Sequence, residues 1–343
     1  MPTRRSFLLA GSASLLLPSL RGFAGSAAAA PATAPTTAPS PIAGIFKAEP
    51  VPGSEVLGAS GLCWWDGRLI VADRENKRLI THTPPDKFGV LKEVTHPVGV
   101  AVDPPTGDLI LTEKPKDGVP RVARLTKDGK DVTLASGPAV GTPHFVAVHS
   151  NGTIFWSGFP DGGTRSLKPG GEVVVHTPRI GHTYGIALSP DERWLYVASK
   201  LPNPDRRGVW RFPLDKDAKA AEAEFFLQVQ ALSPDVPNLP PPNDGKPGLL
   251  GWVGRIQGIA VDALGYLYVA GAESHNSGEA VAVVTPDGKK VIAMILGVPR
   301  NISGLAFGGA DGRTLYITGA GNYRLHQVRL PVPGAGLGRV GGG

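Results

Sequence analysis

Three histidines lie at or just ahead of apolar segments, and their imidazole side chains are of a type that could bind a metal. They are His96, His144 and His182. Three imidazole nitrogens would suit zinc. The spacing of the three residues matches no zinc motif, so two interpretations stay open. They form a zinc site, or they are separate polar side chains near one rim of the fold.

The single cysteine and the absence of familiar sequence motifs exclude several other kinds of chemistry. A lone Cys63 forms neither an intramolecular disulfide nor a cysteine cluster for zinc. It stands between Leu62 and Trp64 in an apolar segment, so we interpret it as a buried packing residue rather than a nucleophile. The chain also lacks the G-x-S-x-G, H-E-x-x-H, phosphate-loop and dinucleotide-binding motifs.

One strand pattern recurs six times and must position any functional side chains. In each copy a small or aromatic residue opens an apolar strand, a turn follows, and a second strand alternates with aromatic residues. A repeat of about 40 residues is typical of a β-propeller, whose four-stranded blades bury their faces by stacking around a ring. The sequence therefore predicts an all-β fold, a six-bladed β-propeller. The copies begin at Gly61, Gly99, Phe145, Gly185, Gly258 and Gly304.

A propeller brings equivalent loops of every blade to the same mouth of a central channel, so equivalent positions converge on one site. Asp103 and Asp262 end two of the inner strands in A-V-D turns. We interpret both as carboxylates that cap turns, because Asp commonly bonds to the backbone just after it in such positions.

Composition limits the partners of the folded chain. The 343 residues carry a formal charge of +6, and 41% of them are hydrophobic. Lys and Arg are scattered and form no basic helix, so we predict no nucleic-acid partner. The expected partner is a small-molecule ligand, and we expect a monomer.

The N-terminal segment resembles a twin-arginine export signal. Arg4-Arg5 is followed by Phe7-Leu8 and a mildly apolar stretch, and small residues at 27–30 offer a cleavage site. We predict a signal peptide at 1–30, a Pro/Ala/Thr-rich linker at 31–42, the propeller at 43–334 and a Gly-rich tail at 335–343. Export would place the protein in the periplasm or outside the cell, with no stable membrane span after cleavage. Retention as an anchor is the alternative.

The longest interval between repeats contains an insertion at about 202–252. Val209 to Phe212 predicts a strand, and Ala218 to Ala231 is rich in Ala, Glu and Gln and predicts a short helix. Pro234 to Gly248 predicts a loop. Two roles stay open for this loop: a lid over the channel mouth, or a loose surface insertion.

Three segments resemble blades of the gluconolactonase, regucalcin (senescence marker protein) and luciferin-regenerating-enzyme-like family. They are G-I-A-L-S-P-D-E-R-W-L-Y-V-A at 185–198, L-A-F-G-G-A-D-G-R-T-L-Y-I-T at 305–318, and R-V-A-R-L at 121–125 with Glu113 upstream. The resemblance runs from about Glu55 to Leu330. It implies a six-bladed propeller whose channel mouth holds one divalent cation, such as calcium or zinc. That cation polarises a lactone carbonyl for hydrolysis.

The positions that bind the cation in this family are occupied by different residues here. The resemblance places the family's metal-binding Glu, Asn and Asp at Ser60, Tyr184 and Gln257, and its substrate-side Asn at His144. Both carboxylates are thus replaced by neutral groups. Since a divalent cation is not desolvated without anionic ligands, we expect no metal site and no cofactor.

The replacing residues allow two interpretations. In the first, His144 is a general base, Ser60 a nucleophile or donor, and Tyr184 and Gln257 are oxyanion donors, which would give metal-free hydrolysis of a lactone or ester. In the second, the same residues are polar side chains lining a wet channel, because no carboxylate is recognisable that would orient His144.

Two functions follow from the resemblance and from these differences. One is an exported lactone or carboxylic-ester hydrolase of the gluconolactonase type, acting on a sugar-derived or similar small molecule. The other is a binding or sensor propeller without turnover. Glu113 and Arg121 match family positions near the mouth, where they would pair with each other or bind the ligand together with Tyr184 and Gln257.

Overall fold

The computed structural model describes residues 42–54, 59–116, 118–176, 180–200, 208–241, 249–253, 255–272, 280–319 and 324–336. All of these residues belong to one compact unit. The signal peptide expected at 1–30, the linker up to residue 41 and the tail beyond residue 336 lie outside the described residues. In the described parts, no helix has the length and apolar character needed to cross a bilayer.

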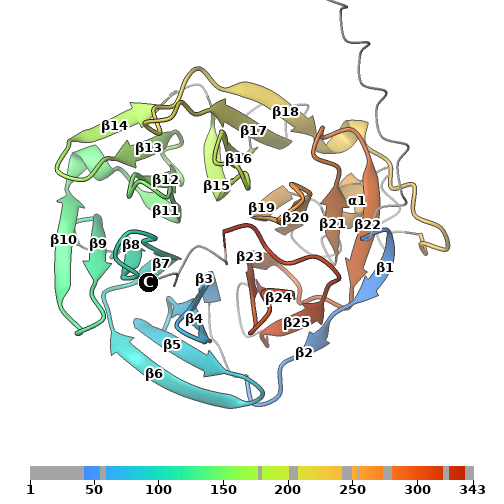
Figure 1. Cartoon of the computed structure of the whole chain (residues 1–343), viewed down its shortest axis with the longest axis horizontal. Helices are drawn as coiled ribbons and strands as arrows, with labels where there is room; N and C mark the ends of the chain where they lie inside the picture. The colour runs from blue at the N-terminus through green and yellow to red at the C-terminus, as the bar shows by residue number, and fades with distance from the viewer. Residues whose placement is uncertain are drawn as a thin grey trace, which may run out of the picture. The chain divides into compact units, whose positions relative to one another are not determined.

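Six sheets surround a central axis and form the blades of a propeller (Figure 1). The predicted all-β, six-bladed fold is confirmed. The first three blades contain β3 (Ala59–Trp65), β4 (Arg68–Asp73), β5 (Arg78–Thr83) and β6 (Lys87–Glu93); β7 (Pro97–Val102), β8 (Leu109–Glu113), β9 (Arg121–Leu125) and β10 (Asp131–Ser136); and β11 (Pro143–Val148), β12 (Ile154–Gly158), β13 (Thr164–Leu167) and β14 (Val173–His176).

The other three blades take up the rest of the ring, and two of them include strands from the start of the propeller. Short helical turns lie at Pro138–Val140, Val229–Ala231 and, as α1, Leu250–Val253. The strands are β15 (His182–Leu188), β16 (Trp194–Lys200), β17 (Gly208–Pro213) and β18 (Glu224–Gln228); β19 (Arg255–Val261), β20 (Leu267–Ala272), β21 (Val281–Val284), β22 (Val291–Leu296) and β1 (Gly44–Lys47); and β23 (Ile302–Gly308), β24 (Thr314–Gly319), β25 (His326–Arg329) and β2 (Glu49–Pro50).

The N-terminal strands close the ring. β1 adds to the outer edge of the fifth blade by pairing in parallel with β22, and β2 completes the sixth blade by pairing antiparallel with β25. These strands come from the first residues of the propeller, so the N-terminal part of the propeller is paired with its last two blades. Closure of the ring in this way covers outer strands that would otherwise be free edges.

The inner strands β3, β7, β11, β15, β19 and β23 share an irregularity near their starts. Each has a shift in its pairing register with the second strand of its blade. Neighbouring inner strands approach closely here. A Cβ atom on Gly99 would lie 2.5 Å from the carbonyl oxygen of His144, and one on Gly304 would lie 2.4 Å from that of Ser60. This close approach explains why most of the sequence repeats open with glycine.

Asp103 and Asp262 cap turns after two inner strands, as predicted. Asp262 is buried, and its Oδ1 accepts hydrogen bonds from the backbone N–H groups of Leu264 at 2.9 Å and Tyr266 at 3.0 Å. Asp103 is also buried and accepts hydrogen bonds from the Thr106 hydroxyl and the Arg124 guanidinium, both at 2.8 Å.

The helix predicted from Ala218 to Ala231 is wrong. Residues Glu224–Gln228 form β18, the outer strand of the fourth blade, and pair with β17, the predicted strand at Val209 to Phe212. Phe225 packs against Trp210, with ring centroids 5.1 Å apart. Pairing and packing along β17 stabilise the extended strand more than the helical propensity of the Ala/Glu-rich residues stabilises a helix.

The described parts of the insertion pack into the junction of the fourth and fifth blades. Val236, Leu249 and Val253 are buried in one cluster with core residues of the fifth blade. The backbone N–H of Leu249 donates to the carbonyl of Leu232 at 2.7 Å. The predicted loop has no named strand within residues 234–241, whereas 242–248 lie outside the described residues. Val236 thus anchors the described part of the predicted loop in the core, while most of its neighbours at 234–241 are exposed, and the choice between a lid and a loose insertion stays a prediction.

Candidate functional site

Four of the predicted site residues lie at the beginnings of inner strands. Ser60 is in β3, His144 in β11, Tyr184 in β15 and Gln257 in β19. Since inner strands of a propeller run in the same direction around the axis, these residues occupy the same end of the channel. The turns capped by Asp103 and Asp262 follow the opposite ends of their strands. We call the end with His144 and Tyr184 the mouth.

His144 and Tyr184 meet at the mouth, together with Phe159 and His182. The ring centroids of His144 and Tyr184 are 5.9 Å apart and their rings are perpendicular, at 89°. Phe159 contacts three of its neighbours, with centroid distances of 4.9 Å to Tyr184, 5.2 Å to His182 and 5.8 Å to His144. These four side chains form what we call the aromatic cluster. Such edge-on and tilted contacts are favourable for aromatic rings.

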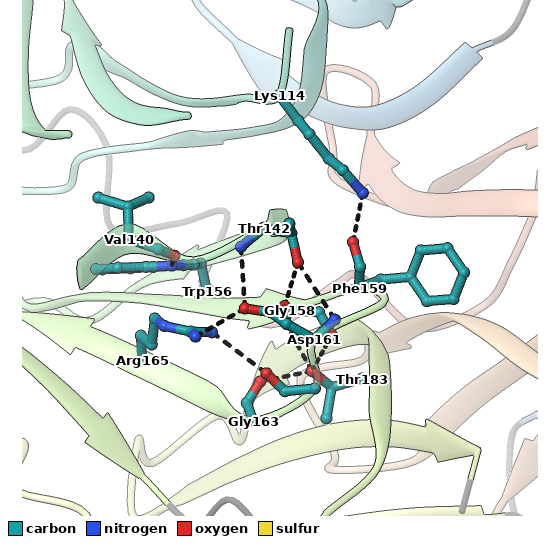
Figure 2. A network of polar contacts seen from close by, with 11 residues as sticks. Lys114, Val140, Thr142, Trp156, Gly158, Phe159, Asp161, Gly163, Arg165 and Thr183 are labelled. Carbon is teal, nitrogen blue, oxygen red and sulfur yellow. Dashed lines mark hydrogen bonds and ion pairs between the residues drawn. The ribbon is translucent and has the colours of Figure 1, made fainter. Parts of the chain in front are cut away.

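Phe159 was not predicted from the sequence, and the loop that carries it is held by a polar network (Figure 2). Its backbone N–H donates to the carbonyl of Thr142 at 3.0 Å. Asp161 accepts hydrogen bonds from the Thr142 backbone N–H at 3.1 Å and from the Arg165 guanidinium at 2.8 Å. Thr183 binds the same loop by donating to the Gly163 carbonyl at 2.7 Å. The loop is thereby tied to the strands on both sides of it.

Lys114 reaches this loop from the second blade. Figure 2 shows its side chain extending to Phe159, where Nζ donates to the backbone carbonyl oxygen. The ammonium also lies 5.5 Å from the centre of the Phe159 ring. Lys114 is partly buried, and burial lowers the pKa of its ammonium below the ordinary value.

His144 is held neutral at the mouth. Burial, with smaller effects from the positive charges of Lys114 and Arg74, lowers the pKa of His144 to about 3. Among the described residues, its Nδ1 has no hydrogen-bond partner. A base with so low a pKa accepts a proton poorly at neutral pH, because catalytic bases work best with a pKa near the operating pH.

Ser60 and His144 are not joined by a hydrogen bond within the described part of the chain. The carbonyl of Ser60 accepts a hydrogen bond from the Thr318 hydroxyl at 3.2 Å, which links the last blade to the first. A nucleophile and its base normally stand within hydrogen-bond reach of each other. The catalytic roles of Ser60 and His144 therefore stay predictions without a contact of this kind to support them.

Glu113 and Arg121 pair with each other, one of the two outcomes expected from the sequence. Arg121 Nε donates to the buried carboxylate of Glu113, and its Nη2 lies 2.8 Å from Asp131. Glu113 also accepts from the Thr95 backbone N–H at 2.8 Å. Burial raises the pKa of Glu113, while the bond to Arg121 opposes that rise. Both side chains are thus occupied by partners within the protein, and the ion pair joins β8 to β9.

The residues at the mouth do not fit a divalent cation. Ser60, Tyr184 and Gln257 offer only neutral oxygen and nitrogen atoms. The carboxylates on the neighbouring loops already have partners: Asp73 binds Arg78 at 2.8 Å, and Asp161 binds Arg165. In the described ranges, no three His, Cys, Asp or Glu side chains gather in a way that could hold a metal. The three-histidine zinc site gains no support from this arrangement.

A separate cavity of about 270 Å³ occupies the body of the channel. Of the four predicted mouth residues, all of them described, Gln257 alone lines it. Cys63 lines it too: it is half-buried rather than buried, it packs against a core cluster as expected, and burial raises the pKa of its thiol. The wall is mostly apolar and includes Leu62, Val146, Ile186, Ile259 and Leu305, with Ala335 and Gly336 of the C-terminal segment.

Comparisons with solved structures agree with the fold. The chain is similar to a gluconolactonase from Xanthomonas campestris, with 22% identity, 81% of this chain and 88% of that chain covered, and a TM-score of 0.60. It is also similar to a calcium-binding regucalcin from Agrobacterium tumefaciens, with 18% identity, coverage of 86% and 97%, and a TM-score of 0.62. A luciferin-regenerating enzyme gives 17% identity, coverage of 84% and 98%, and a TM-score of 0.61.

The sequence itself carries the family assignment. No curated protein matches the chain significantly. The model of the SMP-30/Gluconolactonase/LRE-like region, however, matches residues 59–321, which include strands of every blade and leave out only β1, β2 and β25. The chain therefore belongs to the SMP-30/gluconolactonase/LRE-like family.

Proposed function

We propose that this protein binds a small molecule of the sugar-lactone or ester type at the mouth of the channel and does so without a divalent cation. The observation that carries the proposal is the state of His144, which is neutral and makes no hydrogen bond to Ser60. Beside it, the half-buried ring of Phe159 offers a surface against which a ligand can pack. Ligand sites commonly combine such apolar surfaces with a few polar groups.

Loss of turnover is the second part of the proposal. The family positions for the cation carry Ser60, Tyr184 and Gln257, so no anionic group would compensate a divalent charge there. Without a Lewis acid, hydrolysis would depend on a base whose pKa of about 3 is far below neutral pH. We therefore infer a binding or sensor propeller that keeps the family's scaffold.

Metal-free hydrolysis is the second candidate function. It is favoured by the position of Ser60, His144, Tyr184 and Gln257 at the same end of the channel. In that case Ser60 or a water molecule would attack the lactone carbonyl, and His144 would take up the proton.

A hydrolysis assay on a panel of lactones, run with chelator and with added calcium or zinc, separates these functions. We expect binding of a lactone by calorimetry, with no turnover above the buffer rate under either condition. Turnover stimulated by metal would overturn the proposal. Turnover that is indifferent to chelator, abolished by His144→Ala and kept by the control His326→Ala would establish the second candidate instead.

We also propose that the chain is exported. The support is the Arg4-Arg5 pair with Phe7-Leu8 and the small residues at 27–30. Cell fractionation should find the shortened protein outside the cytoplasm, and the double change Arg4→Lys, Arg5→Lys should keep it inside at full length. An unchanged distribution in that variant would contradict export by this route.

A further inference from the structure

Lys114 differs from four other buried or partly buried cations whose side chains the structure describes at this end of the propeller. Each of these four has a carboxylate within 4.0 Å: Arg74 pairs with Glu75, Arg78 with Asp73, Arg121 with Glu113 and Asp131, and Arg165 with Asp161. Within the described residues, no such ion pair includes Lys114. Its one hydrogen bond goes to the neutral carbonyl of Phe159.

The nearest carboxylate cannot readily become its partner. Asp161 is on the same loop as Phe159, and its two oxygens accept hydrogen bonds from Arg165 and from Thr142. Figure 2 shows the Asp161 carboxylate held by these bonds between Thr142 and Arg165. Partial burial of an ammonium without a compensating charge is unfavourable, so an anion that reached it would be bound.

The charged side chains that act on the Lys114 ammonium, Arg74 and Asp161, each have an ion-pair partner of their own, so Lys114 carries the unpaired positive charge here. Phe159 presents its ring 5.5 Å from Nζ, and the same ring also contacts those of His144 and Tyr184. His144 is uncharged, because its pKa lies near 3. One ammonium balances one negative charge. The site therefore suits a monoanion better than a dianion such as phosphate.

We propose that the ligand of the mouth is a small carboxylate, whose oxygens pair with Lys114 while its body packs on the half-buried ring of Phe159. This inference rests on the proposed binding function and names its ligand class. In electrostatic terms, Lys114 supplies the positive charge at a mouth whose residues do not fit a divalent cation. A charge-assisted bond of this kind is among the stronger polar contacts in proteins.

Calorimetric titration of the purified chain at neutral pH and low salt tests the inference with three probes: gluconate, its uncharged amide gluconamide, and inorganic phosphate. We expect gluconate to bind about 10-fold or more tightly than gluconamide, which is the effect of one hydrogen bond between charged groups. Phosphate should bind more weakly than gluconate. Equal affinities for gluconate and gluconamide, or tighter binding of phosphate, would overturn the inference.

Three variants assign the preference to this side chain. Lys114→Met should bind gluconate and gluconamide equally, whereas Lys114→Arg should keep the preference because the charge is kept. Lys116→Met is the matched control: this lysine is exposed on the same loop, and its loss should leave the preference unchanged. A preference for gluconate that survives in Lys114→Met would contradict the inference. If Lys114→Arg keeps the preference, its loss in Lys114→Met does not arise from misfolding.

The same preparations separate this inference from the proposed function. If a neutral lactone binds without turnover while gluconate and gluconamide bind equally, the ligand class is wrong and the binding function stands. If metal-dependent turnover appears while gluconate binding still depends on Lys114, the carboxylate site stands and the proposed loss of hydrolysis is wrong.

Discussion

At the scale of single residues, the proposed binding function depends on a neutral histidine, His144. Because burial lowers the pKa of His144 from 6.5 to about 3, the unfolded chain binds a proton between these values and the folded chain does not. Stability from this group is therefore complete above about pH 6.5 and falls with pH between 6.5 and 3, by at most about 1.4 kcal/mol per pH unit.

Urea unfolding at pH 7 and pH 4.5 measures this effect. His144→Gln removes the titrating group, so the variant should lose less stability on acidification than the wild-type protein does. If both proteins lose the same free energy of unfolding between the two pH values, His144 is not held neutral by burial and the assignment is incorrect.

Some single residues could be predicted from the sequence and others could not. Asp103 and Asp262 follow apolar strands in A-V-D turns, a local pattern, and the structure confirms that they cap turns. Phe159 and Lys114 occupy loops whose paths depend on contacts from other parts of the chain. No local pattern indicates that these two side chains meet.

At the scale of elements, the loop that carries Phe159 depends on the ion pair of Asp161 with Arg165. Arg165 is nearly buried, at 9% exposure, and Asp161→Ala would leave its guanidinium without a carboxylate partner. We expect a loss of about 1–3 kcal/mol in the free energy of unfolding, together with weaker ligand binding at the mouth. Asp128→Ala, on an exposed turn, is the control and should leave both unchanged. A stable Asp161→Ala protein with full binding would refute this role of the network.

The wrong helix at 218–231 shows why element prediction failed there. Ala, Glu and Gln favour a helix locally, but Phe225 packs on Trp210 and Phe226 packs on Tyr196 only when the segment is extended along β17. The pairing partner lies on another strand, so the decisive contacts are not visible in a local window of sequence.

At the scale of the whole molecule, the ring closes where the last blade meets the first. A methyl group on Gly304 would stand 2.4 Å from the carbonyl of Ser60, and neither backbone can move without shifting a neighbouring blade. Gly304→Ala should therefore lower the free energy of unfolding by about 1–3 kcal/mol, as overpacking does. Gly171→Ala, at a turn where the added Cβ makes ordinary contacts, should be tolerated. Equal stabilities of the two variants would show that close approach does not limit closure.

The six-fold architecture could be predicted because every blade repeats its own strand pattern, and the repeat survives where individual segments are ambiguous. The two N-terminal strands that join the last two blades could not be predicted. These strands, Gly44–Lys47 and Glu49–Pro50, are short and pair with strands far away in the sequence. The same holds for the site, where resemblance to the family gave positions but not their contacts.

We propose that the mouth of this family member works without a divalent cation, and calorimetric titration of chelator-treated protein with calcium and then zinc tests this proposal. We expect no saturable binding at the mouth, and the same heats for the wild-type protein and for variants at Ser60, Tyr184 and Gln257. Tight binding of either ion that is lost on changing any of these three residues would contradict it.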